Sequence, residues 1–102
     1  MHGKTRLRIA VLFGGQSSEH EVSIMSGTNV VAALDPQRYD VVPVFLTREG
    51  RWLLSAFSGG VLATPEDGTE LVLPAGGRGR AFALAPDGSL QDMPRIDIPF
   101  PV

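Results

Sequence analysis

The sequence predicts an α/β fold with a small, mostly parallel sheet, and three segments in the first half of the chain carry that prediction. Residues 6–13 and 39–47 are apolar stretches, the second rich in valine and phenylalanine. Residues 18–34 lie between them and have the start and stop signals of a helix. A strand, a helix and a strand in this order form a βαβ unit, whose two strands run parallel.

The first strand is expected over residues 6–13. Basic and apolar residues alternate at first, and the stretch then becomes continuously apolar, as in a strand that enters the middle of a parallel sheet. The apolar run at residues 9–13 is shorter than the roughly 7–15 residues of a secretory signal core and the roughly 20 of a membrane span. We therefore expect a central, buried strand and no membrane partner.

The helix is expected over residues 18–34. Ser18 and Glu21 match a capping box, in which the serine accepts from a first-turn amide and the glutamate reaches back to the cap. The helix should stop before Pro36, because proline cannot continue a helix and disfavours helical geometry in the residue before it. Its apolar side chains spread around the helix, so we expect a partner domain or subunit to cover more than one side of it.

Three further segments follow the helix. Residues 39–47 should form the second strand, in which Pro43 implies a bulge or a position near an edge, because proline has no amide donor. Residues 51–54 indicate a short further strand. Residues 55–68 are rich in glycine and serine and predict a loop.

The last third of the chain predicts an irregular antiparallel appendage and a final strand. Residues 69–74 and 80–85 are expected to be two short antiparallel strands, followed by a turn at residues 86–88. Residues 96–102 have the apolar character of a returning parallel strand. Because loop-forming residues concentrate between positions 56 and 92, that part should be the most irregular and mobile.

Composition narrows the class of partner. With 102 residues, 43% of them apolar, we expect residues 1–102 to form a single domain. A net charge of -2 gives no field that would attract nucleic acid or an anionic membrane. The chain has no cysteine, which excludes disulfides and thiolate chemistry and fits a cytoplasmic protein.

The glycine turn between the first strand and the helix is the densest motif. A helix start presents unpaired amides and a partial positive charge, so an anion or a polar substrate can bind beside it. The turn is neither a Walker A motif nor a Rossmann fingerprint, because Gly14 and Gly15 are adjacent and no lysine follows them. We expect no nucleotide binding by this chain alone.

The acidic and histidine residues after this turn have simpler explanations as well. Glu19 and Glu21 could be first-turn acids that complement the helix dipole, and we assign Glu21 that structural role. His20 lies between them, but neighbouring residues on a helix diverge and no His-Glu-x-x-His spacing is present, so no metal site is expected. A nucleophile at Ser17, Ser18 or Ser23 is also not expected, because the other histidine is His2 near the terminus.

Residues 10–23, Ala-Val-Leu-Phe-Gly-Gly-Gln-Ser-Ser-Glu-His-Glu-Val-Ser, resemble the opening of the D-alanine:D-alanine ligases. The similarity continues through residues 26–27, 41–44 and 48–52, and residues 100–102 resemble the strand before that family's His-Gly motif. It is weakest in the irregular part of the chain. The resemblance implies a Rossmann-like, pre-ATP-grasp βαβ domain with flanking helices, at the N-terminus of a larger ligase whose central and C-terminal ATP-grasp domains follow.

The resemblance also implies an activity for the intact ligase. Such an enzyme uses ATP and Mg²⁺ to phosphorylate one D-alanine carboxylate, and the amine of a second D-alanine attacks the acyl phosphate to give D-alanyl-D-alanine for peptidoglycan. ATP and Mg²⁺ are handled by the later domains, so this chain alone should bind neither and catalyse nothing. Its expected partners are D-alanine, the remaining ligase domains and a second copy that forms a homodimer through this domain.

Two substrate-binding residues follow from the resemblance. Glu19 matches the glutamate that contacts the ammonium group of the first D-alanine, and Val22 matches the valine beside its methyl group. No complete catalytic set lies in the chain. Two alternatives stay open: a domain of a D-alanine:D-lactate ligase, whose second substrate is chosen elsewhere, and a non-catalytic α/β module for interaction or dimerisation.

Overall fold

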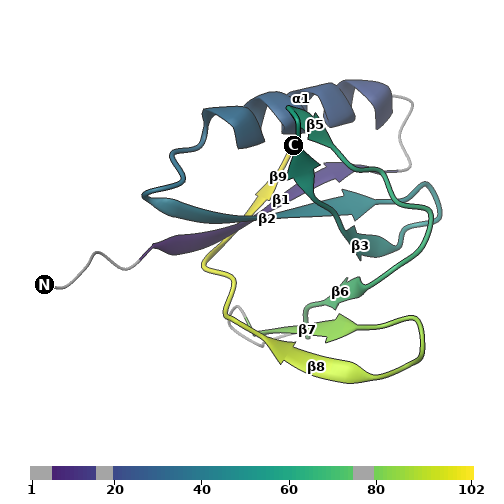
Figure 1. Cartoon of the computed structure of the whole chain (residues 1–102). Helices are drawn as coiled ribbons and strands as arrows, with labels where there is room; N and C mark the ends of the chain where they lie inside the picture. Colours follow the sequence, from purple (N-terminus) through teal and green to yellow (C-terminus); the bar gives the residue numbers. More distant parts are fainter. Residues whose placement is uncertain (1–5, 16–19, 75–79) are drawn as a thin grey trace, which may run out of the picture.

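The computed structural model describes residues 6–15, 20–74 and 80–102, and in this part of the chain one helix packs on a seven-stranded sheet (Figure 1). The sheet order is β8-β7-β6-β3-β2-β1-β9. Its elements are β1 (Leu7–Gly14), α1 (His20–Ala33), β2 (Tyr39–Leu46), β3 (Trp52–Leu54), β6 (Glu70–Val72), β7 (Ala81–Leu84), β8 (Leu90–Met93) and β9 (Ile98–Pro101). A separate hairpin contains β4 (Phe57–Ser58) and β5 (Val61–Leu62). The predicted α/β class is confirmed.

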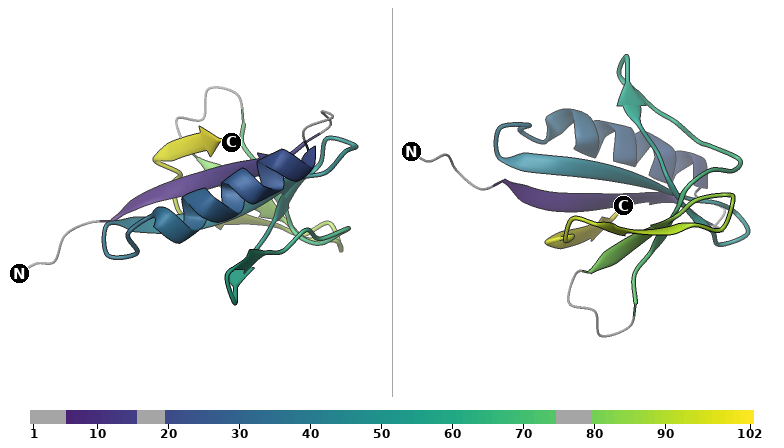
Figure 2. Two further views of the ribbon diagram at one scale, coloured as in Figure 1. Left: turned by 90° about the horizontal axis from the view of Figure 1, so that it is seen from above. Right: turned by 60° about the horizontal axis from the view of Figure 1, so that its bottom comes forward.

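The parallel part of the sheet is centred on β1, as predicted. β1 pairs in parallel with β2 on one side and with β9 on the other. The helix α1 connects β1 to β2 and lies on one face of these strands (Figures 1 and 2). The helix ends at Ala33, one residue before the predicted end, and the predicted capping serine, Ser18, lies outside the described residues.

The antiparallel part continues the same sheet. β3 pairs antiparallel with β2, and β6, β7 and β8 follow in antiparallel order. The two short strands predicted for residues 69–74 and 80–85 are β6 and β7, and the predicted turn carries a backbone hydrogen bond from Gly88 to Ala85. The sheet is therefore mixed, and the expected appendage is an extension of it that ends in an additional strand, β8.

Pro43 lies in an interior strand without a bulge. The β1–β2 register runs residue for residue from Leu7 opposite Tyr39 to Gly14 opposite Leu46. The carbonyl of Pro43 accepts a hydrogen bond from the amide of Ser55, just after β3 ends. Because the nitrogen and carbonyl of one strand residue face the same side, the missing donor of Pro43 faces Ser55, just beyond the end of β3, so the proline interrupts no hydrogen bond within β3 itself.

The predicted loop at residues 55–68 contains the β4–β5 hairpin, which the sequence analysis missed. Gly59 and Gly60 have φ angles of +60° and +79°, which suit a two-residue hairpin turn that L-residues with side chains adopt poorly. The hairpin places Leu62, 3% exposed, in the core beneath α1. This segment is thus a short cover over the helix side of the sheet.

Two hydrophobic clusters fill the two faces of the parallel strands. Alternate side chains of β1 point to opposite faces, so the strand contributes to both clusters. In Figure 1, α1 lies above β1 and β2, and β6–β8 lie below them. The helix-side cluster contains Ile9, Val11, Phe13, Val31, Phe45 and Leu62, and the opposite cluster contains Ala10, Leu12, Val44, Leu71, Ala81 and Ile96.

Side chains close both ends of the ladder between β1 and β9. At the start, the amide of Arg8 donates to the Asp97 carboxylate at 2.8 Å, and at the other end Ser23 takes this role. Within β9, the residues whose backbone groups face β1 alternate with Pro99 and Pro101, whose nitrogens and carbonyls face outward. The outer edge of β9 therefore carries carbonyl acceptors at these two positions and no amide donors.

Candidate functional site at the carboxyl ends of β1 and β9

The strand order locates a candidate site at the carboxyl ends of β1 and β9. After β1 the chain continues through α1 to β2, which lies on one side of β1 in the sheet. The last strand, β9, lies on the other side of β1. Ligands of open α/β sheets bind outside the carboxyl ends of the strands, where the strand order reverses in this way. The start of α1 adjoins this point, so helix amides and strand ends converge there.

The glycine turn leaves β1 in a conformation that requires glycine. Gly14 has a φ of +92°, and a Cβ atom there would lie 2.6 Å from the carbonyl oxygen of Leu46. The amide of Gly15 donates to that same carbonyl at 2.8 Å. The turn is therefore bound closely to the end of β2, which fixes where the chain enters the site.

His20 anchors the turn from the helix side. Its side chain is 6% exposed, and its Nδ1 atom lies 2.5 Å from the carbonyl oxygen of Gly15. A carbonyl only accepts, so Nδ1 carries the proton of this hydrogen bond. The ring packs edge-on against Phe45 at a centroid distance of 5.5 Å. His20 thus has a structural role, and no group of three metal-ligating side chains occurs among the described residues.

Ser23 joins the ends of the two strands. The amide of Gly14 donates to Ser23 Oγ at 3.0 Å, and Ser23 Oγ donates to the carbonyl oxygen of Val102 at 2.8 Å. Sequence reasoning considered this serine only as a nucleophile. A usable signal was its position three residues after His20, because residues at this spacing share one face of a helix.

Of the two residues assigned to substrate binding from the sequence, the structure describes only one. Glu19 lies outside the described residues. Val22 is 57% exposed near the start of α1, so its side chain is open to a ligand or to another part of the protein. Glu21 is also exposed, and its carboxylate lies 3.7 Å from the guanidinium of Arg48, a surface pair that contributes little.

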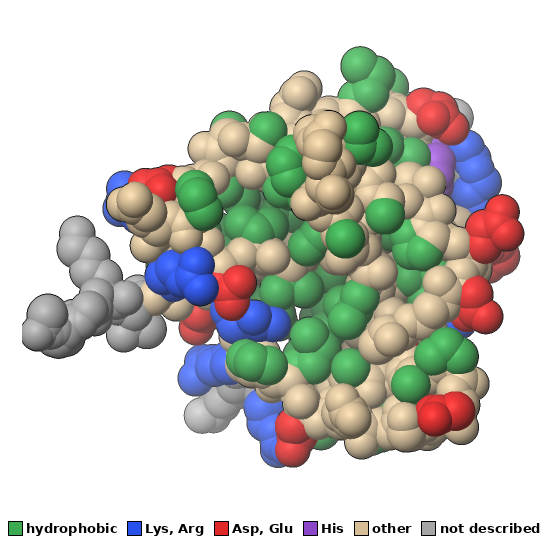
Figure 3. All heavy atoms as spheres, viewed as in Figure 1, with side chains coloured by type: hydrophobic (Ala, Val, Ile, Leu, Met, Phe, Trp, Pro, Cys, Tyr) green, Lys and Arg blue, Asp and Glu red, His purple; other side chains and the backbone are tan. Residues whose placement is uncertain are grey.

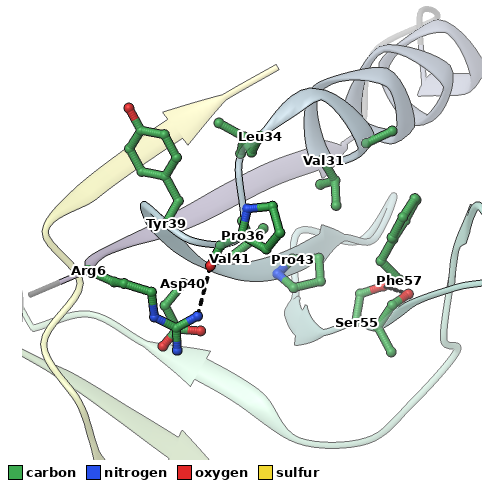
Figure 4. A pocket seen from close by; sticks show the side chains of 12 residues that line it. Arg6, Val31, Leu34, Pro36, Tyr39, Asp40, Val41, Pro43, Ser55 and Phe57 are labelled. Atoms are coloured by element: carbon green, nitrogen blue, oxygen red, sulfur yellow. Dashed lines mark hydrogen bonds between the residues drawn. The ribbon is translucent and has the colours of Figure 1, made fainter. Parts of the chain in front are cut away.

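Two cavities flank the helix. One, of about 570 Å³, lies at the carboxyl end of β2 beside His20, Thr47 and Arg48. The other, of about 590 Å³, lies toward the opposite ends of the strands and is largely apolar, with Tyr39 and Phe57 in its wall (Figure 4). Only the first adjoins the candidate site. No helix in the described ranges is long and apolar enough to cross a membrane.

Comparison with known proteins decides the family. The family model described as the D-ala D-ala ligase N-terminus matches residues 8–102. The chain belongs to this family. The D-alanine-D-alanine ligase A of Brucella suis is 54% identical over 97 residues, which cover 95% of the chain and 28% of the relative. The D-alanine-D-alanine ligase of Mycobacterium avium is 37% identical over 112 residues, covering 100% of the chain and 30% of the relative.

Solved structures of ligases share the fold. The VanG D-Ala:D-Ser ligase of Enterococcus faecalis aligns with a TM-score of 0.71 at 22% identity, over 95% of the chain and 29% of that ligase. The D-alanine-D-alanine ligase of Helicobacter pylori aligns with a TM-score of 0.61 at 20% identity, over 91% of the chain and 28% of that ligase. The chain therefore corresponds to the N-terminal domain of the D-alanine-D-alanine ligases and spans less than a third of the relatives named above.

Proposed function

We propose that this chain provides part of the first D-alanine site of an ATP-dependent ligase that joins two D-alanines into D-alanyl-D-alanine for peptidoglycan. The observation that carries the proposal is the family match over residues 8–102, which includes the glycine turn and the start of α1. The position of this turn at the reversal of strand order supports it, because substrates of such sheets bind there.

Within this site, Glu19 pairs with the ammonium group of the first D-alanine and Val22 lies beside its methyl group. A carboxylate next to a helix start can bind an ammonium group while the free amides remain available to the substrate carboxylate. The exposure of Val22 on α1 supports its role, since the described residues leave its side chain uncovered.

ATP and Mg²⁺ are bound by the ATP-grasp domains of the intact ligase. Phosphoryl transfer requires cationic clamps and metal-binding carboxylates around the phosphates. Lys4 is the only lysine of this chain, and the described residues contain no cluster of three metal-ligating side chains. The bound nucleotide supplies the phosphoryl group, and this domain supplies the binding and orientation of the first amino acid.

The partners of the domain are the remaining ligase domains and a second copy of the chain, in the cytoplasm. Met25 is 67% exposed on α1, three residues after the exposed Val22, so the outer face of the helix presents apolar surface. A neighbouring domain or protomer that covers this face would bury it, in agreement with the spread of apolar residues around the helix.

The test is an assay of the whole ligase that contains this chain. With ATP, Mg²⁺ and D-alanine, we expect phosphate release and a dipeptide product detected by mass spectrometry, whereas the purified 102-residue chain should give neither. A whole protein that forms no dipeptide would contradict the proposal. Product formed only when D-lactate is supplied with D-alanine would identify the D-alanine:D-lactate alternative.

A further inference from the structure

We propose that the Ser23 hydroxyl is a positioning group that holds the carboxyl ends of β1 and β9 apart and so sets the geometry of the first-substrate site. The inference rests on the proposed function, because it concerns the same site. Ser23 itself need not touch the substrate. It acts through the two strand ends and through the helix turn on which it lies.

The hydrogen-bond pattern shows where the Ser23 hydroxyl is inserted between β1 and β9. In the parallel ladder, Leu12 lies opposite Pro101, and the amide of Val102 donates to the carbonyl of Leu12 at 2.9 Å. The next rung of such a ladder would run from the amide of Gly14 to the carbonyl of Val102. Instead, both groups bind Ser23 Oγ, at 3.0 and 2.8 Å. One hydroxyl therefore replaces one direct rung.

The chemistry of serine suits this position. A hydroxyl has one donor and two acceptor sites, so it can accept from an amide and donate to a carbonyl at the same time. Alanine can do neither, and would leave the Gly14 amide and the Val102 carbonyl without this partner or let the two strands close directly on each other. Either change alters the opening between the strand ends.

The position also couples the strands to the proposed substrate contacts. Ser23 follows Val22 directly on α1, and Glu19 precedes the first residue of that helix in the sequence. The two hydrogen bonds of Ser23 thus fix this end of the helix relative to β1 and β9. A displacement of about 1 Å in a positioning element can reduce a rate about 100-fold, so a small shift here has a measurable effect.

The test is Ser23→Ala in the whole ligase, with D-alanine varied over a range that separates the two D-alanine sites. We expect kcat/KM for the first D-alanine to fall about 10- to 100-fold, with the KM for ATP within about twofold of the original. Ser23→Thr retains the hydroxyl and should recover most of the loss. Thr28→Val is the matched control, because the Thr28 hydroxyl donates within its own helix, to the carbonyl of Ile24 at 2.9 Å, and reaches neither β1 nor β9 in the described structure.

Several outcomes would overturn the inference. If S23A melts at a lower temperature but keeps its first-site kinetics, Ser23 has only a structural role. Equal losses in S23A and S23T would assign the effect to side-chain volume. If S23A fails to fold, Ser23→Cys replaces it in the kinetic comparison, because a thiol donates and accepts only weak hydrogen bonds. If the wild-type ligase is active and S23A has the same first-site kinetics, this inference alone is overturned. If the wild-type protein joins no D-alanine, the proposed function is overturned as well.

Discussion

Glu19 is the residue whose replacement tests the proposed substrate contact most directly. Glu19→Gln keeps the size of the side chain and removes the charge on which the proposed contact with the ammonium group depends. A hydrogen bond to a charged group contributes about 1.5–3 kcal/mol, so kcat/KM for the first D-alanine should fall about 10- to 150-fold. The KM for ATP should hardly change. Steady-state kinetics of the whole ligase measures both.

Glu21→Gln is the control for this experiment. It removes a charge only two residues further along the sequence, but the Glu21 side chain is exposed and its contact with Arg48 is a surface pair. We expect kinetics close to those of the original enzyme. If Glu19→Gln behaves in the same way, Glu19 is only a first-turn acid that complements the helix dipole, and its assignment to substrate binding is wrong.

Asp67 gives a prediction about pH. A hydrogen bond from the Gly68 amide, and next the Arg51 guanidinium at 2.9 Å, hold the pKa of Asp67 below its ordinary value of 3.8. The folded state then binds this proton less readily than the unfolded state, so the stabilisation is present at neutral pH and is lost as pH falls below about 4. The urea midpoint should decline over that range, and less steeply in Asp67→Asn.

At the scale of an element, the close contact between α1 and β1 depends on Gly27. A Cβ atom at this position would lie 2.8 Å from the Cβ of Phe13, which is too close for a packed contact. Gly27→Ala gains up to about 1 kcal/mol of helix propensity, but overpacking costs about 1–3 kcal/mol. We expect a net loss of about 1 kcal/mol in the free energy of unfolding, measured by urea denaturation.

Asn29→Ala is the matched control, because Asn29 is exposed on the same helix. It should leave stability unchanged or raise it by up to about 0.7 kcal/mol, since alanine has the higher helix propensity. A Gly27→Ala protein as stable as Asn29→Ala would show that the helix can move away from Phe13 without cost.

The elements that the sequence predicted well are those with a long local pattern. β1, α1 and β2 have clear apolar runs or start and stop signals, and β9 has the apolar character of a returning parallel strand, although most of its residues are exposed. The β4–β5 hairpin was missed because strands of two residues have no measurable periodicity, although Gly59-Gly60 was a usable turn signal. Its stabilising contact, Leu62 beneath α1, is a tertiary packing effect.

The candidate site was predictable only where it depends on residues that are close together in the sequence. The glycine turn at Gly14 and Gly15 is local, and the sequence placed it, whereas the predicted capping residue of the helix, Ser18, lies outside the described residues. The Ser23–Val102 hydrogen bond joins residues 79 positions apart, and whether such residues meet depends on the order of the strands. That order, with β9 beside β1, can be stated only once the whole sheet is assembled.

At the scale of the whole molecule, the distribution of apolar surface predicts self-association of the isolated chain. Figure 3 shows hydrophobic side chains gathered on the middle of one face, and Val22 and Met25 add exposed apolar surface on α1. Apolar surface that another domain or protomer would cover favours association when it is left open. Sedimentation should show oligomers that increase with concentration, and Met25→Glu should shift them toward monomer. A monomer over a wide concentration range would contradict this.

The two prolines of β9 have a consequence for the domain during its synthesis. An N-terminal domain emerges from the ribosome and folds before the rest of the protein, so its sheet edges are exposed to identical nascent chains on the same messenger RNA. A strand added beside β9 would receive no hydrogen bond from Pro99 or Pro101, since neither has an amide proton. This edge is therefore a poor template for misassembly between neighbouring ribosomes.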